Sequence, residues 1–175
     1  MKIAVTDACI FIDLIELDLV STFFQLHVEL HTTVDVINEL YSDQKQLLQA
    51  YEVVNKLYVH NLDAGDFSKM GSIPFPRGLS HQDKSVIYLA LTLKNAIVLS
   101  SDKLVRIFAE KQGLECHGLL WIIDELVDQD LVYKDLAASI LQRLVSSNSM
   151  YSTPTVRKEV DNRVQAWRRK NDPTR

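Results

Sequence analysis

The sequence predicts an α/β protein: a three-layer α/β/α sandwich with a central parallel sheet, followed by a C-terminal helical extension. Short apolar runs typical of buried strands alternate along the chain with longer periodic segments typical of helices. Strands and helices that alternate at this spacing form a parallel sheet with helices on both faces. The 175 residues suit one ordinary domain with an extension. We therefore expect a main domain over residues 1–147 and a tail over residues 148–175.

The first half of the chain is predicted to hold three strands and four helices. Between residues 63 and 79, three glycines and two prolines interrupt any regular pattern, so this stretch is predicted to be a loop. The predicted strands are residues 2–6, 29–32 and 57–62, and the predicted helices are residues 10–17, 19–26, 34–41 and 43–55.

The second half continues the alternation and ends in helices. Gly113 is placed to end the helix before it, because glycine readily adopts the conformation that follows a helix C-terminus. Ser152 and Pro154 predict the cap and first turn of a tail helix. The remaining predicted strands are residues 96–100 and 114–117, and the helices are residues 81–94, 103–112, 119–128 and 134–145.

The composition, 47% hydrophobic and 24% charged, is typical of a globular protein and excludes disordered and fibrous classes. Every apolar run is far shorter than the roughly 20 residues that span a bilayer, so no membrane association is expected. Asp7 comes too early for the apolar core of a signal peptide. Cys9 and Cys116 form no CxxC pair and no disulfide framework, which indicates the reducing cytoplasm.

The net charge of −4 argues against a protein that coats nucleic acid nonspecifically, but the charge is uneven. From residue 154 onward there are seven Lys and Arg against three Asp and Glu, so this segment carries +4 and the rest carries −8. The tail also has an apolar stripe at helical spacing. This stripe packs on its own domain or on a dimer mate, or the tail contacts RNA phosphates. The stripe consists of Val156, Val160, Val164 and Trp167.

Two aspartates follow predicted strands directly: Asp7 after the first strand and Asp102 after the run AIVLSS. In open parallel sheets, ligands bind outside the carboxyl ends of the strands. Aspartate is also a favoured helix N-cap, and each of these residues precedes a predicted helix. The residues alone leave both interpretations open, a helix cap and a metal ligand.

Two further carboxylates have equally ordinary explanations. Asp83 lies three residues after Ser80, a spacing that resembles a capping box. Glu39 neighbours the apolar side of a predicted helix, while Asp13 and Glu16 are predicted to be surface charges. Carboxylates brought together would repel one another unless a cation joins them, and Mg²⁺ and Mn²⁺ prefer oxygen ligands.

Four segments occur in an order that resembles the PIN domain, the metal-dependent ribonuclease fold of VapC-type toxins: VTDACIFIDL, VINELY, LSHQDKSVIYLAL and VLSSDKLVR. The resemblance covers residues 1 to about 145. It implies that Mg²⁺ or Mn²⁺ is held by an acidic set that is also catalytic. It further implies that Ser100 supports the Asp102 loop and that Arg106 pairs with Asp102 or contacts phosphate. The implied acidic set is Asp7, Glu39, Asp83 and Asp102.

The resemblance implies hydrolysis of RNA phosphodiester bonds by the toxin of a type II toxin–antitoxin pair. It also implies an antitoxin partner and a homodimer. The alternative is a catalytically weak PIN fold that binds RNA or protein without cutting. Cys9 stands where many relatives carry Ser, Thr or Asn, and no second carboxylate closely follows Asp102. These two departures favour the alternative.

Overall fold

The computed structural model describes residues 2–169. The chain divides into two compact units, the first ending at Leu119 and the second beginning at Leu120. This division falls earlier than the boundary at residue 147 that the sequence predicts for the main domain.

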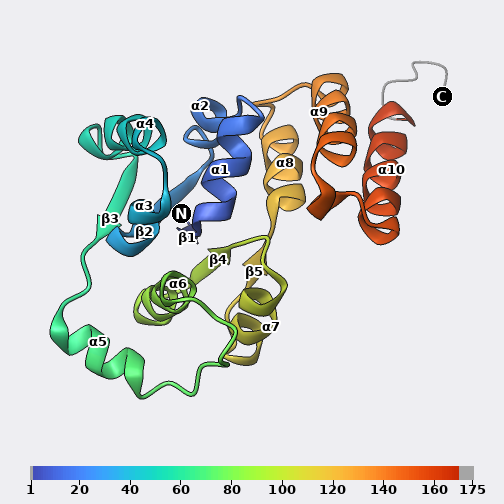
Figure 1. Cartoon of the computed structure of the whole chain (residues 1–175). Helices are drawn as coiled ribbons and strands as arrows, with labels where there is room; N and C mark the ends of the chain where they lie inside the picture. The colour runs from blue at the N-terminus through green and yellow to red at the C-terminus, as the bar shows by residue number, and fades with distance from the viewer. Residues whose placement is uncertain (1, 170–175) are drawn as a thin grey trace. The chain divides into compact units, whose positions relative to one another are not determined.

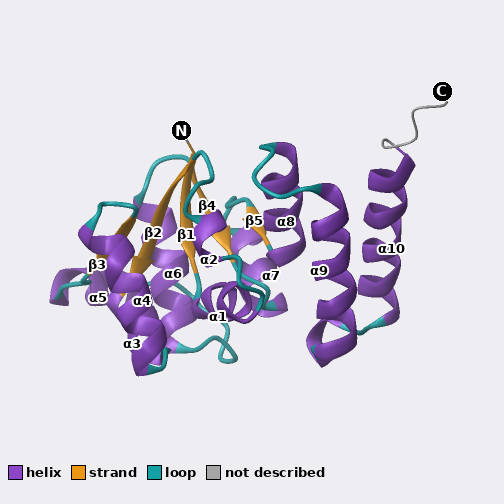
Figure 2. Ribbon diagram, turned by 90° about the horizontal axis from the view of Figure 1, so that it is seen from above, coloured by secondary structure: helices purple, strands orange, loops and turns teal. Residues whose placement is uncertain are grey.

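The first unit is built around five strands whose neighbours all pair in parallel, in the order β3-β2-β1-β4-β5 (Figure 2). The predicted fold class is confirmed. β1 lies in the middle, so the chain leaves it toward β2 on one side and later returns to β4 on the other. The strands are β1 (Lys2–Thr6), β2 (Val28–Thr33), β3 (Leu57–His60), β4 (Ala96–Leu99) and β5 (Cys116–His117).

Helices cover both faces of this sheet (Figure 1). Right-handed crossovers place the helices that follow β1 and β2 on one face and those that follow β3 and β4 on the other. On the second face, α6 contacts β1, β2 and β4, and its residues from Ser85 to Ala90 are buried. The helices are α1 (Ala8–Glu16), α2 (Val20–Phe23), α3 (Val34–Glu39), α4 (Ser42–Val53), α5 (Ala64–Gly71), α6 (His81–Thr92) and α7 (Lys103–Lys111).

The predicted loop over residues 63–79 is wrong in its first part, because residues 64–71 form helix α5, whereas residues 72–79 form no helix or strand, as predicted. Asp63 and Asp66 form a reciprocal capping box that starts this helix. Two of the three glycines that suggested a loop, Gly65 and Gly71, occupy the first turn and the last position of the helix, where they interrupt few backbone hydrogen bonds. Met70 then anchors α5, since it is buried against Leu62 and Tyr88.

Asp13 corrects a second expectation. It was predicted to be a surface charge, but it is only 7% exposed on the inner side of α1. Its neighbours along that side, Ile10 and Leu14, are fully buried, so the carboxylate lies within the packed face of the helix. Glu16 is exposed, as predicted.

The second unit consists of helices. Val160 and Val164 on α10 are buried, and α10 packs against α9. The Arg163 Nε donates to Asp124 Oδ2 over 2.9 Å and so ties α10 to α8. Val160 and Val164 of the apolar stripe are therefore buried within the same chain, whereas Val156 and Trp167 are half-buried, and residues 170–175 lie outside the described part. The elements are α8 (Leu119–Asp128), α9 (Lys134–Ser147), a short 3-10 turn (Ser149–Tyr151) and α10 (Pro154–Arg169).

No helix among residues 2–169 is long and apolar enough to cross a membrane.

The central position of α6 gives a stability prediction. Ile87 is fully buried, whereas Leu91, one turn further along the same helix, is 38% exposed. Ile87→Ala should lower the free energy of unfolding by about 2–5 kcal/mol, because it removes apolar contacts and leaves a cavity. Leu91→Ala should lower the free energy of unfolding by about 1 kcal/mol or less, because this side chain is already partly exposed. Urea unfolding of both variants measures the difference, and equal losses would contradict the assigned core.

Candidate carboxylate site

The topology brings Asp7 and Asp102 to the same place. β1 and β4 are neighbouring parallel strands that end side by side, and the backbone N–H of Asp7 donates to the carbonyl of Leu99 over 3.0 Å. The chain reverses its direction across the sheet between these two strands. Ligands of open parallel sheets bind outside the strand ends at such a switch point.

The four carboxylates singled out in the sequence line one pocket of about 400 Å³. They reach it from different elements, because each lies at the end of a helix that borders the strand ends. Asp7 and Asp102 are the N-caps of α1 and α7, Asp83 is in the first turn of α6, and Glu39 is the last residue of α3. The pocket is completed by Ala8, Cys9, Ile12 and Ser80.

Helix capping uses one oxygen of each aspartate. Asp7 Oδ1 accepts a hydrogen bond from the N–H of Ala8 over 2.6 Å. Asp83 Oδ2 accepts from the N–H of Ser80 over 2.8 Å. Asp102 Oδ1 accepts from the N–H groups of Leu104 and Val105, over 2.7 and 2.9 Å. The capping interpretation is therefore correct for all three residues.

Capping nevertheless leaves much of the carboxylate set available. In residues 2–169, no group donates a hydrogen bond to Asp83 Oδ1, to Asp102 Oδ2 or to either oxygen of Glu39. An ionised carboxylate has about four acceptor sites, so a cap occupies only a fraction of them. A single aspartate can thus cap a helix and still present an oxygen to a ligand.

Hydrogen bonds of Ser100 link the residues that follow β1 and β4. Its buried hydroxyl donates to Asp7 Oδ2 over 2.8 Å and accepts from the N–H of Asp102 over 3.1 Å. Cys9 contributes to the same network, because its thiol donates to Asp7 Oδ2 over 3.3 Å and accepts from the N–H of Ser101 over 3.4 Å. Cys9 thus makes two polar contacts within this network.

Burial and the charges of neighbouring carboxylates raise the pKa values of Asp7 and Glu39. Burial raises the pKa of Asp7, and the charge of Asp83 adds to the increase, while hydrogen bonds from Ser100, Cys9 and the Ala8 N–H oppose it. The pKa of Glu39 is raised mainly by partial burial, then by the charges of Asp7 and Asp83. A bound cation would relieve this repulsion.

The oxygen donors suit Mg²⁺ or Mn²⁺, although the side chains form no tight cage. Among residues 2–169, no group of three or more His, Cys, Asp and Glu side chains is arranged to hold a metal ion. Mg²⁺ normally keeps several water ligands and takes only one or two carboxylates directly, with substrate phosphates completing its shell. The volume of about 400 Å³ leaves room for a hydrated ion beside the carboxylates that line the pocket.

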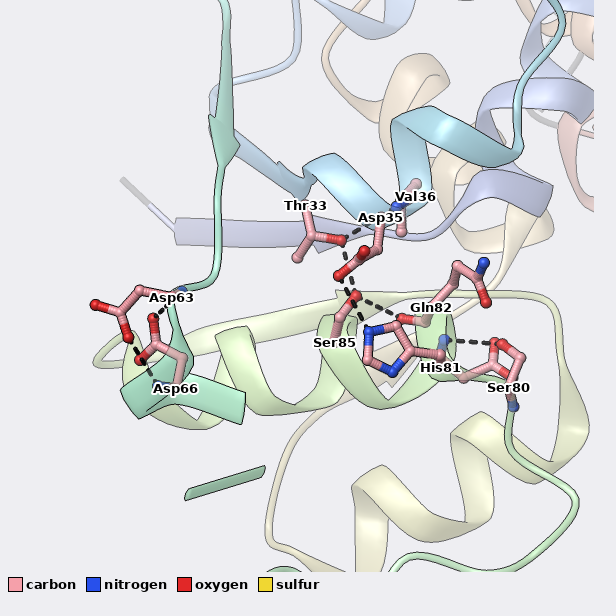
Figure 3. Close-up of polar contacts among 10 residues, drawn as sticks. Thr33, Asp35, Val36, Asp63, Asp66, Ser80, His81, Gln82 and Ser85 are labelled. Carbon is pink, nitrogen blue, oxygen red and sulfur yellow. Dashed lines mark hydrogen bonds and ion pairs between the residues drawn. The ribbon is translucent and has the colours of Figure 1, made fainter. Parts of the chain in front are cut away.

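Helices α3 and α6, which carry Glu39 and Asp83, are joined by polar contacts of Thr33 with Ser85 and of Asp35 with His81 (Figure 3). Thr33 caps α3, accepting from the N–H of Val36, and its hydroxyl lies 2.8 Å from the Ser85 hydroxyl on α6. His81 Nε2 lies 3.5 Å from Asp35 Oδ2. The sequence did not indicate this support, because Thr33 and Ser85 lie 52 positions apart.

Arg106 does not line the carboxylate pocket and lies instead near Gly118 and Cys116. No ion pair in the described part of the chain joins it to Asp102. Its guanidinium lies so close to Gly118 that a Cβ there would be 3.0 Å from Nη2. The nearby Arg106 charge also partly offsets the effect of burial, which raises the pKa of Cys116 to about 11. The pairing with Asp102 that the sequence suggested is not observed.

The Ser100 network predicts a measurable loss of stability. Ser100→Ala would leave both Asp7 Oδ2 and the N–H of Asp102 without this partner. We expect the free energy of unfolding to fall by about 1–3 kcal/mol in buffer with EDTA. Ser146→Ala is the matched control, since its hydroxyl bonds only the Arg143 carbonyl at an exposed position. Calorimetry of the two variants tests the network, and a neutral Ser100→Ala would exclude it.

Comparison with known proteins places these features in a family. A family model described as DUF3368, a PIN domain, matches residues 3–166. A solved structure of a PilT N-terminus domain protein from the hyperthermophilic archaeon Sulfolobus solfataricus is similar, with 16% sequence identity and a TM-score of 0.49. The similarity covers 69% of this chain and 90% of that one. None of the curated proteins matches the chain. Because the family model spans nearly the whole sequence, the chain belongs to the PIN-domain family.

Proposed function

We propose that this chain is a Mg²⁺- or Mn²⁺-dependent endoribonuclease that hydrolyses RNA phosphodiester bonds. PIN domains are typically divalent-metal-dependent nucleases. The observation that carries the proposal is that one pocket at the switch point of the sheet is lined by Asp7, Glu39, Asp83 and Asp102. Asp83 and Asp102 each keep one oxygen, and Glu39 both oxygens, that accept no hydrogen bond from residues 2–169.

The four carboxylates then share two tasks, holding the cation and orienting the attacking water. Asp7, Asp83 and Asp102 hold the cation, directly or through water, and Ser100 keeps the Asp7 carboxylate in place. Glu39, at the end of α3, accepts a hydrogen bond from the attacking water and orients it. When bound, the divalent ion lowers the pKa of water and stabilises charge on the attacking and leaving oxygens. The acidic pocket accepts a polyanion because the cation reverses its local charge.

We further propose a toxin role, with an antitoxin as partner, in the cytoplasm. Its support is the ordered resemblance of four segments to VapC-type proteins. A homodimer is proposed on the same ground. Residues 119–123 and the tail stripe also made a dimer plausible. Five of these residues, Leu119, Ile122, Ile123, Val160 and Val164, are buried within the single chain, and the other four, Leu120, Trp121, Val156 and Trp167, are half-buried.

The decisive test separates capping from catalysis. Asp83 and Asp66 both occupy the third position of a capping box, but only Asp83 lines the carboxylate pocket. With Mn²⁺ or Mg²⁺ and a mixed RNA pool, wild type and Asp66→Asn should cleave. Asp83→Asn should lose at least about a hundredfold in rate, since it removes a charge from the metal site while its amide oxygen can still cap. Gel analysis of the products measures the rates, with EDTA as the metal-free control.

Two results would contradict this account. If Asp83→Asn and Asp66→Asn behave alike, Asp83 acts only as a cap. If wild type binds RNA but does not cut it with any metal tested, the chain is a PIN fold that serves as an RNA-binding module. If it also fails to bind RNA, a protein-binding role becomes the better proposal.

A further inference from the structure

A second pocket, of about 440 Å³, lies on the other side of the first turn of α6. It is formed by α5, the segment that follows it and the start of α6, and only His81 and Lys84 of its lining lie in a motif that resembles other PIN domains. Its volume is in the range of pockets that take small organic groups, about 300–1,000 Å³. The lining residues are Phe67, Met70, Gly71, Ile73, Pro74, Phe75, His81 and Lys84.

Aromatic rings give this pocket its character. Phe67 is 39% exposed, and its ring centroid lies 5.5 Å from that of His81. The ring of Phe75 packs against the ring of buried Phe108, with their centroids 5.1 Å apart, and this contact fixes its position. An exposed phenylalanine beside a second, fixed ring is an arrangement on which a planar heterocycle can stack.

A lysine, Lys84, also lines this aromatic pocket. Lys84 forms no ion pair with any residue between 2 and 169, although it is partly buried at the pocket wall. His81 on the same turn is oriented by Asp35, 3.5 Å away (Figure 3). A pocket with aromatic walls and an unpaired ammonium complements a base together with its phosphate better than it complements an apolar peptide side chain.

The two pockets share one helical turn. Ser80 and Asp83 line the carboxylate pocket, and their sequence neighbours His81 and Lys84 line the aromatic one. Successive helical residues point about 100° apart, so this turn forms a wall common to both pockets. An RNA strand with its phosphate at the carboxylates therefore has a base within reach of the aromatic rings.

We propose that the pocket of Phe67, Phe75 and Lys84 binds one unpaired nucleobase of the RNA strand next to the cleaved phosphate and so sets base preference there. This proposal rests on the ribonuclease function proposed above. Phe67 stacks on the base, and Lys84 contacts the adjoining phosphate. Single-stranded substrate is required, because a base inside a duplex cannot reach the rings.

The test measures RNA binding separately from cleavage. Short single-stranded RNAs, each with one abasic sugar at a successive position, are titrated by fluorescence anisotropy with Ca²⁺ in place of Mg²⁺ or Mn²⁺, so that a cation can neutralise the carboxylates. Gels check that the RNA stays uncut during the titration. For wild type, one abasic position should weaken binding by roughly 5- to 100-fold, the loss expected for one stacked base. Phe67→Ala and Phe67→Leu should bind intact RNA with a similar loss and show no further loss at that abasic position, as expected for two changes to one contact.

Matched variants keep the test independent of folding. Tyr58→Ala removes an aromatic ring of nearly equal exposure, 41%, outside the pocket and should leave binding unchanged. Lys84→Gln should weaken binding and flatten its salt dependence, whereas Lys94→Gln, beyond the other end of α6, should do neither. Circular dichroism checks that each variant is folded.

The outcomes distinguish this proposal from the ribonuclease proposal. RNA binding by wild type that is unchanged in both Phe67 variants and in Lys84→Gln overturns the base pocket alone and favours a protein ligand for it. RNA binding that depends on Phe67, without cleavage at any Mn²⁺ concentration, supports the base pocket and refutes the nuclease. Failure of wild type to bind any single-stranded RNA overturns both.

Discussion

The structure depends on one electrostatic constraint: the sheet topology forces several carboxylates toward one point. β1 and β4 end side by side, and each is followed by an aspartate that caps the next helix. Neighbouring α6 adds Asp83 through its own cap. Helix N-termini favour negative charge, which lowers the cost of placing each aspartate there. The remaining repulsion appears in the raised pKa values of Asp7 and Glu39, and a divalent cation is the natural group to remove it.

The same constraint explains why capping and metal binding are compatible. The backbone N–H groups of α6 and α7 hold one oxygen of Asp83 and Asp102, which fixes the side chain and leaves the other oxygen without a partner in residues 2–169. Asp7 differs, because both of its oxygens accept hydrogen bonds: Oδ1 from the N–H of Ala8, and Oδ2 from Ser100 and Cys9. The caps thus prepare the carboxylates for a ligand before it binds, and little rearrangement is needed.

Much of this was predictable from sequence, because apolar runs and helix-start residues are local signals. The strand ends pointed to Asp7 and Asp102, whereas Glu39 and Asp83 were chosen through the resemblance to PIN domains. Helix α5 was missed because glycine and proline content outweighed its capping box. The contacts of Ser100 could not be derived from residue patterns, since it binds Asp7 from 93 positions away. The aromatic pocket beside α6 was also missed, because Phe67 meets His81 only after the chain folds.

The most direct measurement is the anomalous scattering of Mn²⁺ in crystals of the metal-loaded protein. The account predicts a difference peak in the pocket lined by Asp7, Asp83 and Asp102, with water filling part of the coordination shell. The peak should disappear in crystals of Asp102→Asn grown under the same conditions. Absence of a peak in the wild-type pocket at saturating Mn²⁺, or a peak only elsewhere on the surface, would contradict a metal-dependent site.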